Sequence, residues 1–192
     1  MKHIKFFILL TFSLVSFVLS DEYHIDKSKS NMVKFISDAP LEDFEGITDK
    51  IDGYIYWEDE NMLAQSQMYF EVDLNSLDTG IGLRNRHMRE NYLETNKYPL
   101  THFKGQLTSA TQSSNNSYQV TAQGVMFIHG VENEITVEGT MIPVEDGFRI
   151  QTEFITTLTD YNIEVPQLMF FKIDEHMRLK LDFYIKRYDK NE

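Results

Sequence analysis

Hydrophobic and polar positions alternate with a period of two along most of the chain after its first twenty residues. In residues 66–74, Met68, Phe70, Val72 and Leu74 are separated by side chains that carry a polar group. A strand places successive side chains on opposite faces, so this pattern is typical of strands with one apolar and one polar face. The pattern recurs in residues 51–57, 118–128, 134–142, 148–158 and 177–186.

Two shorter alternating segments, residues 32–37 and 102–109, bring the prediction to about eight strands. Several connections between these segments, such as residues 128–133, are too short for a helical crossover, which favours antiparallel neighbours. An antiparallel sheet of this size can remove its exposed edges by closing on itself. We therefore predict an all-β fold, a single antiparallel β-barrel, with a sandwich as the alternative.

Two segments interrupt the alternation. Residues 38–50 are acidic and rich in turn-forming residues, with Phe44 among the few apolar positions, and show no strand pattern. In the second segment Met88 and Tyr92 stand four residues apart, which places them on one face of a helix. The sequence therefore predicts a short helix around residues 83–93.

The first twenty residues have the organisation of a secretory signal peptide. Lys2 and Lys5 precede an apolar run from Phe6 to Leu19, which is followed by Ser20, a small residue suited to peptidase recognition. An uncleaved anchor is the alternative, but the run is short for a span of about 20 residues. We predict cleavage before Asp21, a single folded domain over residues 21–192, a periplasmic or secreted location, and no stable membrane span after cleavage.

Charge and composition exclude several classes of protein. The chain has 18 basic and 30 acidic residues, a net charge of −12, and loss of the two leader lysines makes the charge −14. A nucleic-acid partner is not expected, because such partners require a broad basic surface. There is no cysteine, which excludes thiolate catalysis and cysteine-ligated metals.

One segment of this acidic chain is cationic. Arg84, Arg86, His87 and Arg89 fall within six residues of the predicted helix. Arginine presents a planar fork of donors that matches phosphate or carboxylate, so the segment could bind an anionic head group. The alternative is structural, with the arginines tying the segment to nearby acidic residues.

The sequence offers no recognisable catalytic or metal-binding motif. It contains no serine-nucleophile elbow, no phosphate-binding glycine loop and no closely spaced histidine pair. We predict that the protein is not an enzyme, has no catalytic or metal-binding residues, and needs no cofactor other than a bound lipid.

Four segments, in order along the chain, resemble the YceI-like family of exported lipid-binding proteins. They are "FEVDLNSLDTG", "RNRHMRENYLETNKYPLTHFKG", "GVMFIHGVENEITVEG" and "LTDYNIEVPQLMFFKIDEHMRLKLDFYI". One departure is Glu90-Asn91-Tyr92-Leu93, where the family commonly has an Asp-Phe-Phe stretch. The resemblance implies a long lipocalin-like barrel whose apolar tunnel holds an amphipathic lipid, either a polyisoprenoid or a polyisoprenoid quinone.

From the resemblance and the alternation together we predict a non-catalytic carrier with two sets of ligand-binding residues. The predicted lumen residues are Trp57, Met68, Phe70, Val72, Phe154, Leu181 and Phe183. The predicted mouth residues, for the head group, are Arg84, Arg86, His87 and Tyr92. Two alternatives stay open: an enzyme that uses the same cavity for hydrolysis or redox chemistry, and an interaction protein with a filled core and an acidic surface. Self-association as a homodimer is also left open.

Overall fold

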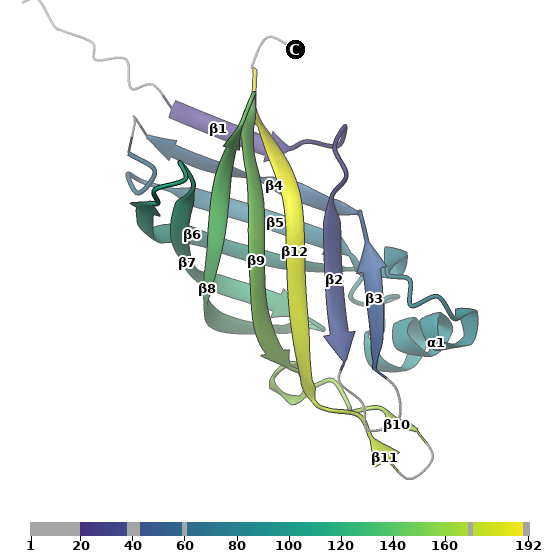
Figure 1. Cartoon of the computed structure of the whole chain (residues 1–192). Coiled ribbons are helices and arrows are strands. Elements are labelled where there is room, and N and C mark those ends of the chain that lie inside the picture. The colour runs from purple at the N-terminus through teal and green to yellow at the C-terminus, as the bar shows by residue number, and fades with distance from the viewer. Residues whose placement is uncertain (1–19, 38–42, 59–60, 169–170, 190–192) are drawn as a thin grey trace, which may run out of the picture.

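The structure, a computed structural model, describes residues 20–37, 43–58, 61–168 and 171–189 (Figure 1). All but the last residue of the predicted signal peptide therefore lie outside the described residues. Within the described ranges, no helix has the length and apolar character needed to cross a membrane.

Strands account for most of the described chain. They are β1 (Ser20–Ile25), β2 (Met32–Ser37), β3 (Phe44–Thr48), β4 (Ile51–Glu58), β5 (Gln67–Asp73), β6 (Leu100–Gln112), β7 (Tyr118–Ile128), β8 (Val131–Val144), β9 (Gly147–Thr157), β10 (Gln167–Leu168), β11 (Phe171–Lys172) and β12 (His176–Arg187). The helical elements are η1 (Leu74–Ser76), α1 (Gly82–His87), η2 (Met88–Tyr92), which is a π-helical turn, and η3 (Leu158–Tyr161).

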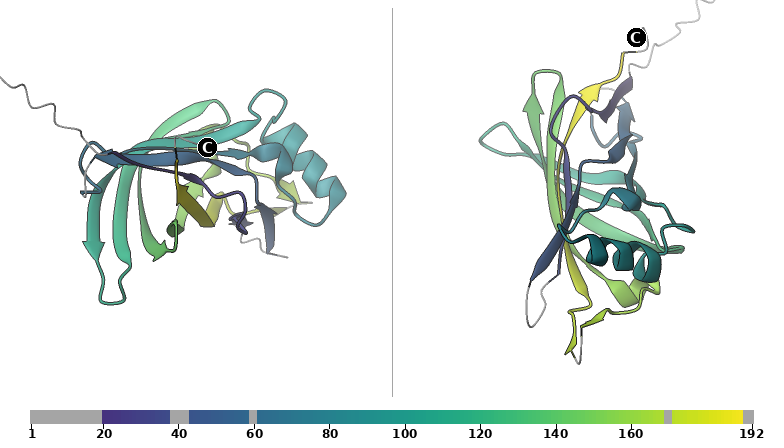
Figure 2. Two further views of the ribbon diagram at one scale, coloured as in Figure 1. Left: turned by 90° about the horizontal axis from the view of Figure 1, so that it is seen from above. Right: turned by 90° about the vertical axis from the view of Figure 1, so that its right-hand side faces the viewer.

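Eight strands form a closed antiparallel ring (Figures 1 and 2). The order around the ring is β1-β4-β5-β6-β7-β8-β9-β12, and it closes where β12 returns to β1, with Ile185 opposite Ile25. The predicted antiparallel barrel of about eight strands is confirmed, and so is the short helix, which the structure divides between α1 and η2.

Two positions in the ring are occupied by interrupted strands. Along one edge of β12, residues 185–187 pair with β1 and residues 177–182 pair with β2, so β2 continues the course of β1 after a break at residues 26–31. In the same way β3 precedes β4 with a break at residues 49–50. β4 pairs with β5 along most of its length. β3 has no such ladder on this side and keeps only the bridge between Ile47 and Asp78. The wall is therefore open between β3 and β5 below the breaks.

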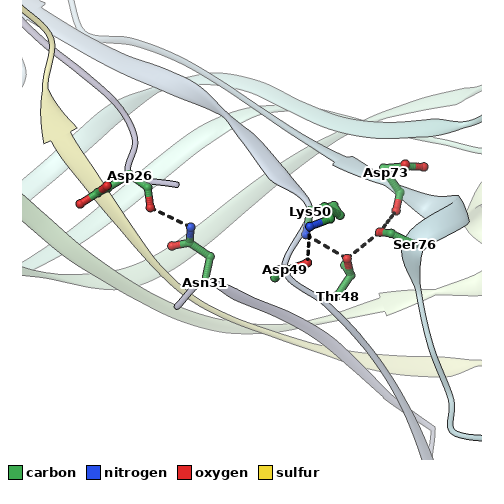
Figure 3. A network of polar contacts seen from close by, with 7 residues as sticks. All are labelled: Asp26, Asn31, Thr48, Asp49, Lys50, Asp73 and Ser76. Carbon is green, nitrogen blue, oxygen red and sulfur yellow. Dashed lines mark hydrogen bonds and ion pairs between the residues drawn. The ribbon is translucent and has the colours of Figure 1, made fainter. Parts of the chain in front are cut away.

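Side-chain hydrogen bonds complete the backbone bonding at the first break (Figure 3). The Asn31 amide donates to the Asp26 carbonyl at 3.0 Å and accepts from the Tyr184 backbone N–H at 2.9 Å. Asn31 is buried, so its side chain supplies partners that a continuous strand would otherwise provide.

The second break is bonded in a similar way (Figure 3). Thr48 Oγ1 accepts from the Lys50 N–H at 2.9 Å and lies 2.5 Å from the Ser76 hydroxyl. Ser76 in turn donates to the Asp73 carbonyl at 2.5 Å. These bonds fix the point where β3 turns away from β4 and satisfy backbone groups that the ladder leaves unpaired.

In the main sheet, two observed strands carry no signal in the alternation. β1 begins at Ser20, at the edge of the predicted leader, and β3 lies inside the acidic segment at residues 38–50 that shows no strand pattern. In β3 only Gly46 and Thr48 are buried, and Ile47 is exposed, because this strand pairs fully on one side alone. Without a conventional apolar face, β3 could not be recognised from hydrophobic periodicity.

The half of the barrel above the breaks is filled by side chains. Trp57 is 2% exposed and stacks on Tyr23, with ring centroids 4.9 Å apart, and Phe148 packs edge-on against both rings. The cluster also contains Ile25, Ile55, Met68, Leu107, Val120, Met141, Phe183 and Ile185. We call this region the packed half.

Candidate functional site

The half of the barrel below the breaks encloses an apolar cavity of about 550 Å³. Its wall is made by side chains of β4, which contributes Ile51, of β5, β6, β7, β9 and β12, and of the paired strands β2 and β3. The wall residues include Val33, Phe35, Phe44, Phe70, Val72, Thr101, Phe103, Met126, Ile128, Phe154, Thr156, Met177, Leu179 and Leu181. We call this region the hollow half.

Two segments cover the cavity. One is formed by α1 and η2, which contribute Leu83, Met88 and Tyr92 to the lining, and the other is the chain from η3 onward, which contributes Tyr161 and Ile163. Figures 1 and 2 show α1 beside β3, where the wall has separated. The cover closes the side on which β3 has no strand partner, since β3 pairs with β2 but not with β5.

The Asp-Thr-Gly turn before α1 anchors this cover. Asn85 Nδ2 donates to the Asp78 carboxylate at 2.7 Å, and the Asn85 side-chain oxygen accepts from the Thr79 N–H at 2.8 Å. The bond from Asn85 and a second one from the Gly80 N–H hold the pKa of Asp78 below its ordinary value. Since Asp78 also forms the backbone bridge to Ile47, the turn ties α1 to β3.

Arg84 places a cation at the edge of the apolar cavity. Its guanidinium donates from Nε to Thr79 Oγ1 at 3.0 Å and from Nη2 to the Thr79 carbonyl at 2.7 Å, and lies 4.8 Å from the centre of the Phe44 ring. In the described part of the chain, no carboxylate forms an ion pair with it. The site therefore combines an apolar interior with a preorganised cation at one edge.

His129 fastens the cover at its other side. It lies in the two-residue turn with Gly130 between β7 and β8, and its Nε2 is 3.0 Å from the Glu94 carboxylate while its Nδ1 is 3.1 Å from the Tyr161 carbonyl. Both partners are acceptors, so each contact calls for a ring N–H as the donor. Hydrogen bonds from Lys97 and then from His129 lower the pKa of Glu94.

The seven predicted lumen residues divide between the two halves. Phe70, Val72, Phe154 and Leu181 line the cavity. Trp57, Met68 and Phe183 also point into the barrel, but they belong to the packed half and are separated from the cavity by neighbours such as Phe70, whose ring packs edge-on against Phe183 at 5.2 Å. The four cavity residues are therefore candidates for ligand contact, whereas the three residues of the packed half are not.

The four predicted mouth residues also divide. Arg84, His87 and Tyr92 are part of the cavity lining, whereas Arg86 is exposed on α1 and is not. Alternation in strands gave no indication of the other lining residues on the cover, such as Leu83 and Ile163. It also missed Phe35 and Phe44 as a pair across the β2–β3 hairpin, although Phe44 was visible as an isolated apolar position in an acidic segment.

The lining limits the chemistry of the cavity. Among the described residues it includes arginine, histidine, threonine and tyrosine side chains at a few points, but no aspartate or glutamate. The described chain also brings no three histidine or acidic side chains together in a way that could hold a metal ion. The arrangement is suited to enclosing an apolar molecule and fixing one polar end.

Comparisons with solved structures find the same fold at low sequence identity. BcnA of Burkholderia cenocepacia superposes with a TM-score of 0.67 at 18% identity, covering 82% of this chain and 97% of that one. A polyisoprenoid binding domain from Saccharophagus degradans gives 0.67 at 16% identity, covering 86% and 98%. The YceI protein of Campylobacter jejuni gives 0.55 at 12% identity, covering 98% and 95%.

A comparison with curated proteins finds no relative by sequence. A family model described as the YceI-like domain matches residues 23–185, from the fourth residue of β1 almost to the end of β12. That match extends over far more than half of the chain, and the chain therefore belongs to the YceI-like family.

Proposed function

We propose that the protein is an exported, non-catalytic carrier that holds an isoprenoid-type amphipathic lipid in the hollow half of its barrel. The observation that carries the proposal is the apolar cavity of about 550 Å³ inside the barrel. That size is within the range of about 300–1,000 Å³ for small-molecule sites. The relative from S. degradans is described as a polyisoprenoid binding domain, which supports a ligand of this class.

The hydrocarbon chain supplies most of the binding free energy. Each buried CH₂ group contributes about 0.8 kcal/mol, so a few isoprene units bind without a strong polar contact. Phe70, Val72, Phe154 and Leu181 are the proposed chain contacts. Arg84, His87 and Tyr92 are the proposed head-group contacts, because they lie where the lining changes from apolar to polar.

The lining favours carriage over the two alternatives. Hydrolysis or redox catalysis would require a general acid and base that converge on one bound atom. In the described lining the bases lack a carboxylate partner, and His87 is exposed on α1. An interaction protein with a filled core would not leave an open volume beside a well-packed cluster.

The direct test is mass spectrometry of lipids extracted from the protein after native purification from a host that exports it. We expect an isoprenoid lipid in the wild type and a loss of it in Leu181→Asp, which puts a charge on the cavity wall. The matched control is Ile155→Asp, at an outward position of β9 that is 66% exposed. Extraction of no lipid from the wild type, or equal loss in both variants, would contradict the proposal.

Export is a separate part of the proposal. We infer that residues 1–20 direct the chain across the membrane and are removed before Asp21. The intact mass of the exported protein checks this, since cleavage at that position removes the first twenty residues and no others. A mass that retains those residues would show an anchored protein instead.

A further inference from the structure

Two large apolar side chains are exposed at the rim of the cavity. Ile81, the residue before α1, is 49% exposed, and Leu83 in its first turn is 55% exposed. A single exposed apolar side chain is ordinary in a soluble protein. These two differ from such cases because both also line the cavity, so an apolar surface continues from the interior to the outside.

The segment that carries this apolar rim has a net positive charge, opposite in sign to that of the protein as a whole. Residues 80–93 contain three arginines and one glutamate, in a chain whose net charge is −12. Arg86 is exposed, and it forms no ion pair with any described residue. Arg84 and the exposed His87 lie beside it on the same short helix.

The strands away from α1 carry acidic side chains. On β8, Glu132, Glu134 and Glu138 are exposed at alternate positions of the outer face, and Figure 1 shows β8 and α1 on opposite sides of the barrel. A negatively charged surface would repel the side that carries β8 and attract the rim, which fixes the orientation of approach.

We propose that residues 80–89 form a docking surface for an anionic lipid bilayer and hold the cavity mouth against it. Ile81 and Leu83 enter the boundary between head groups and acyl chains, while Arg84, Arg86 and His87 contact anionic head groups. The inference rests on the proposed carrier function, since it names the surface from which the same cavity is filled. A lipid chain then passes from the bilayer into the lining along apolar contacts.

The test is co-sedimentation of the exported protein with vesicles, with its N-terminus checked by intact mass. Vesicles of phosphatidylcholine with phosphatidylglycerol are compared with vesicles of phosphatidylcholine alone. We expect stronger binding to the anionic vesicles and a decrease at high salt, because exposed charges are screened. Arg86→Glu should weaken binding about fivefold or more, since each cation near such a surface contributes about 1 kcal/mol.

Matched variants separate the docking surface from general charge and hydrophobicity. Leu83→Ser should weaken vesicle binding severalfold, whereas Ile155→Ser, at an equally exposed position on β9, should leave it unchanged. Lys104→Glu, on the outer face of β6, is the matched control for Arg86→Glu. Equal losses in the controls, equal binding to neutral vesicles, or no sedimentation would overturn the proposal.

Two further outcomes would show whether the docking proposal or the carrier proposal is wrong. If the protein binds anionic vesicles through Arg86 but retains no isoprenoid lipid, the docking surface is supported and the carrier function is contradicted. If it retains lipid and forms a dimer that Leu83→Ser dissociates, with no vesicle binding, the rim is an interface between two copies and the docking proposal falls.

Discussion

The packed half and the hollow half are built from the same strands, yet one is a solid core and the other a cavity. β5 contributes Met68 to the packed half and Val72 to the border of the cavity, and β12 contributes Phe183 to the first and Leu181 to the second. The side chains on both sides of the division are similar in size and polarity. The difference therefore comes from the backbone and not from the kind of residue.

The breaks in two strands explain the difference. Above the breaks β1 pairs with β4, and Tyr23 and Trp57 on these neighbouring strands pack together against Phe148 of β9. Below the breaks β3 pairs with β2 but keeps only the bridge to Asp78 on its other side, so the wall has no continuous strand ladder between β3 and β5.

The largest expected effect is on the packed half. Trp57→Ala removes a buried ring with two aromatic neighbours and leaves an enclosed void, so we expect a loss of about 3–5 kcal/mol in the free energy of unfolding. Urea unfolding followed by circular dichroism measures it. A loss below about 1 kcal/mol would mean that the packed half is not a close-packed core.

The second expected effect is on the break itself. Asn31→Ala leaves the Tyr184 N–H without its side-chain acceptor and the Asp26 carbonyl without its amide donor. The Asp26 carbonyl keeps the Lys29 N–H at 3.2 Å, so we expect a loss of about 1–3 kcal/mol, mainly for the Tyr184 N–H left unsatisfied, together with weaker lipid retention. Gln119→Ala, which removes an exposed bond to Thr140, is the control and should cost less than about 0.5 kcal/mol. Equal effects of the two would show that the break has no structural role.

The breaks also show what could be predicted from the sequence and what could not. Period-two alternation was enough for the barrel and for six of its long strands, because each of them has one apolar face. Alternation does not distinguish a residue that meets a neighbour across the barrel, such as Trp57, from one that faces a cavity, such as Phe154. That distinction depends on contacts between distant segments, such as the hydrogen bond from the Tyr184 N–H to Asn31 across 153 residues.

The cover of the cavity was predicted in part. The helix at residues 83–93 could be predicted because Met88 and Tyr92 have helical spacing. Its cations could be read directly from the sequence. The fastening by His129 was not, since its partners Glu94 and Tyr161 come from distant segments. A histidine before a glycine in a short hairpin was the only local signal, and it is equally consistent with a simple turn.

The third expected effect concerns a residue of the hollow half. Phe154→Ala removes a ring that already faces open space, so no new enclosed void forms and we expect a loss of only about 1–2 kcal/mol. Lipid retention should fall more clearly than stability, which is the reverse of the result for Trp57→Ala. Comparing the two variants by urea unfolding and by extracted lipid tests the division of the barrel directly. Equal losses of stability would contradict it.

The smallest expected effect is a loss of stability at the first break when the pH is lowered. Burial tends to raise the pKa of Asp26, but hydrogen bonds from the Ser28 hydroxyl at 2.6 Å and the Ser28 N–H at 3.0 Å lower it below the ordinary value of 3.8. A carboxyl with a lowered folded pKa contributes stability above its unfolded pKa, and this contribution is lost as the pH falls through the folded pKa. The break should therefore loosen only below about pH 3.8.

Trp57 is the only tryptophan of the chain, so its fluorescence reports on the packed half alone, while retained lipid reports on the hollow half. Because the loosened break lies between the two, we expect lipid to be released at a higher pH than the change in Trp57 emission. Asp26→Asn removes the titrating group and should bring the two transitions together. If lipid release and the emission change coincide in the wild type as well, the two halves unfold as one unit and the break does not separate them.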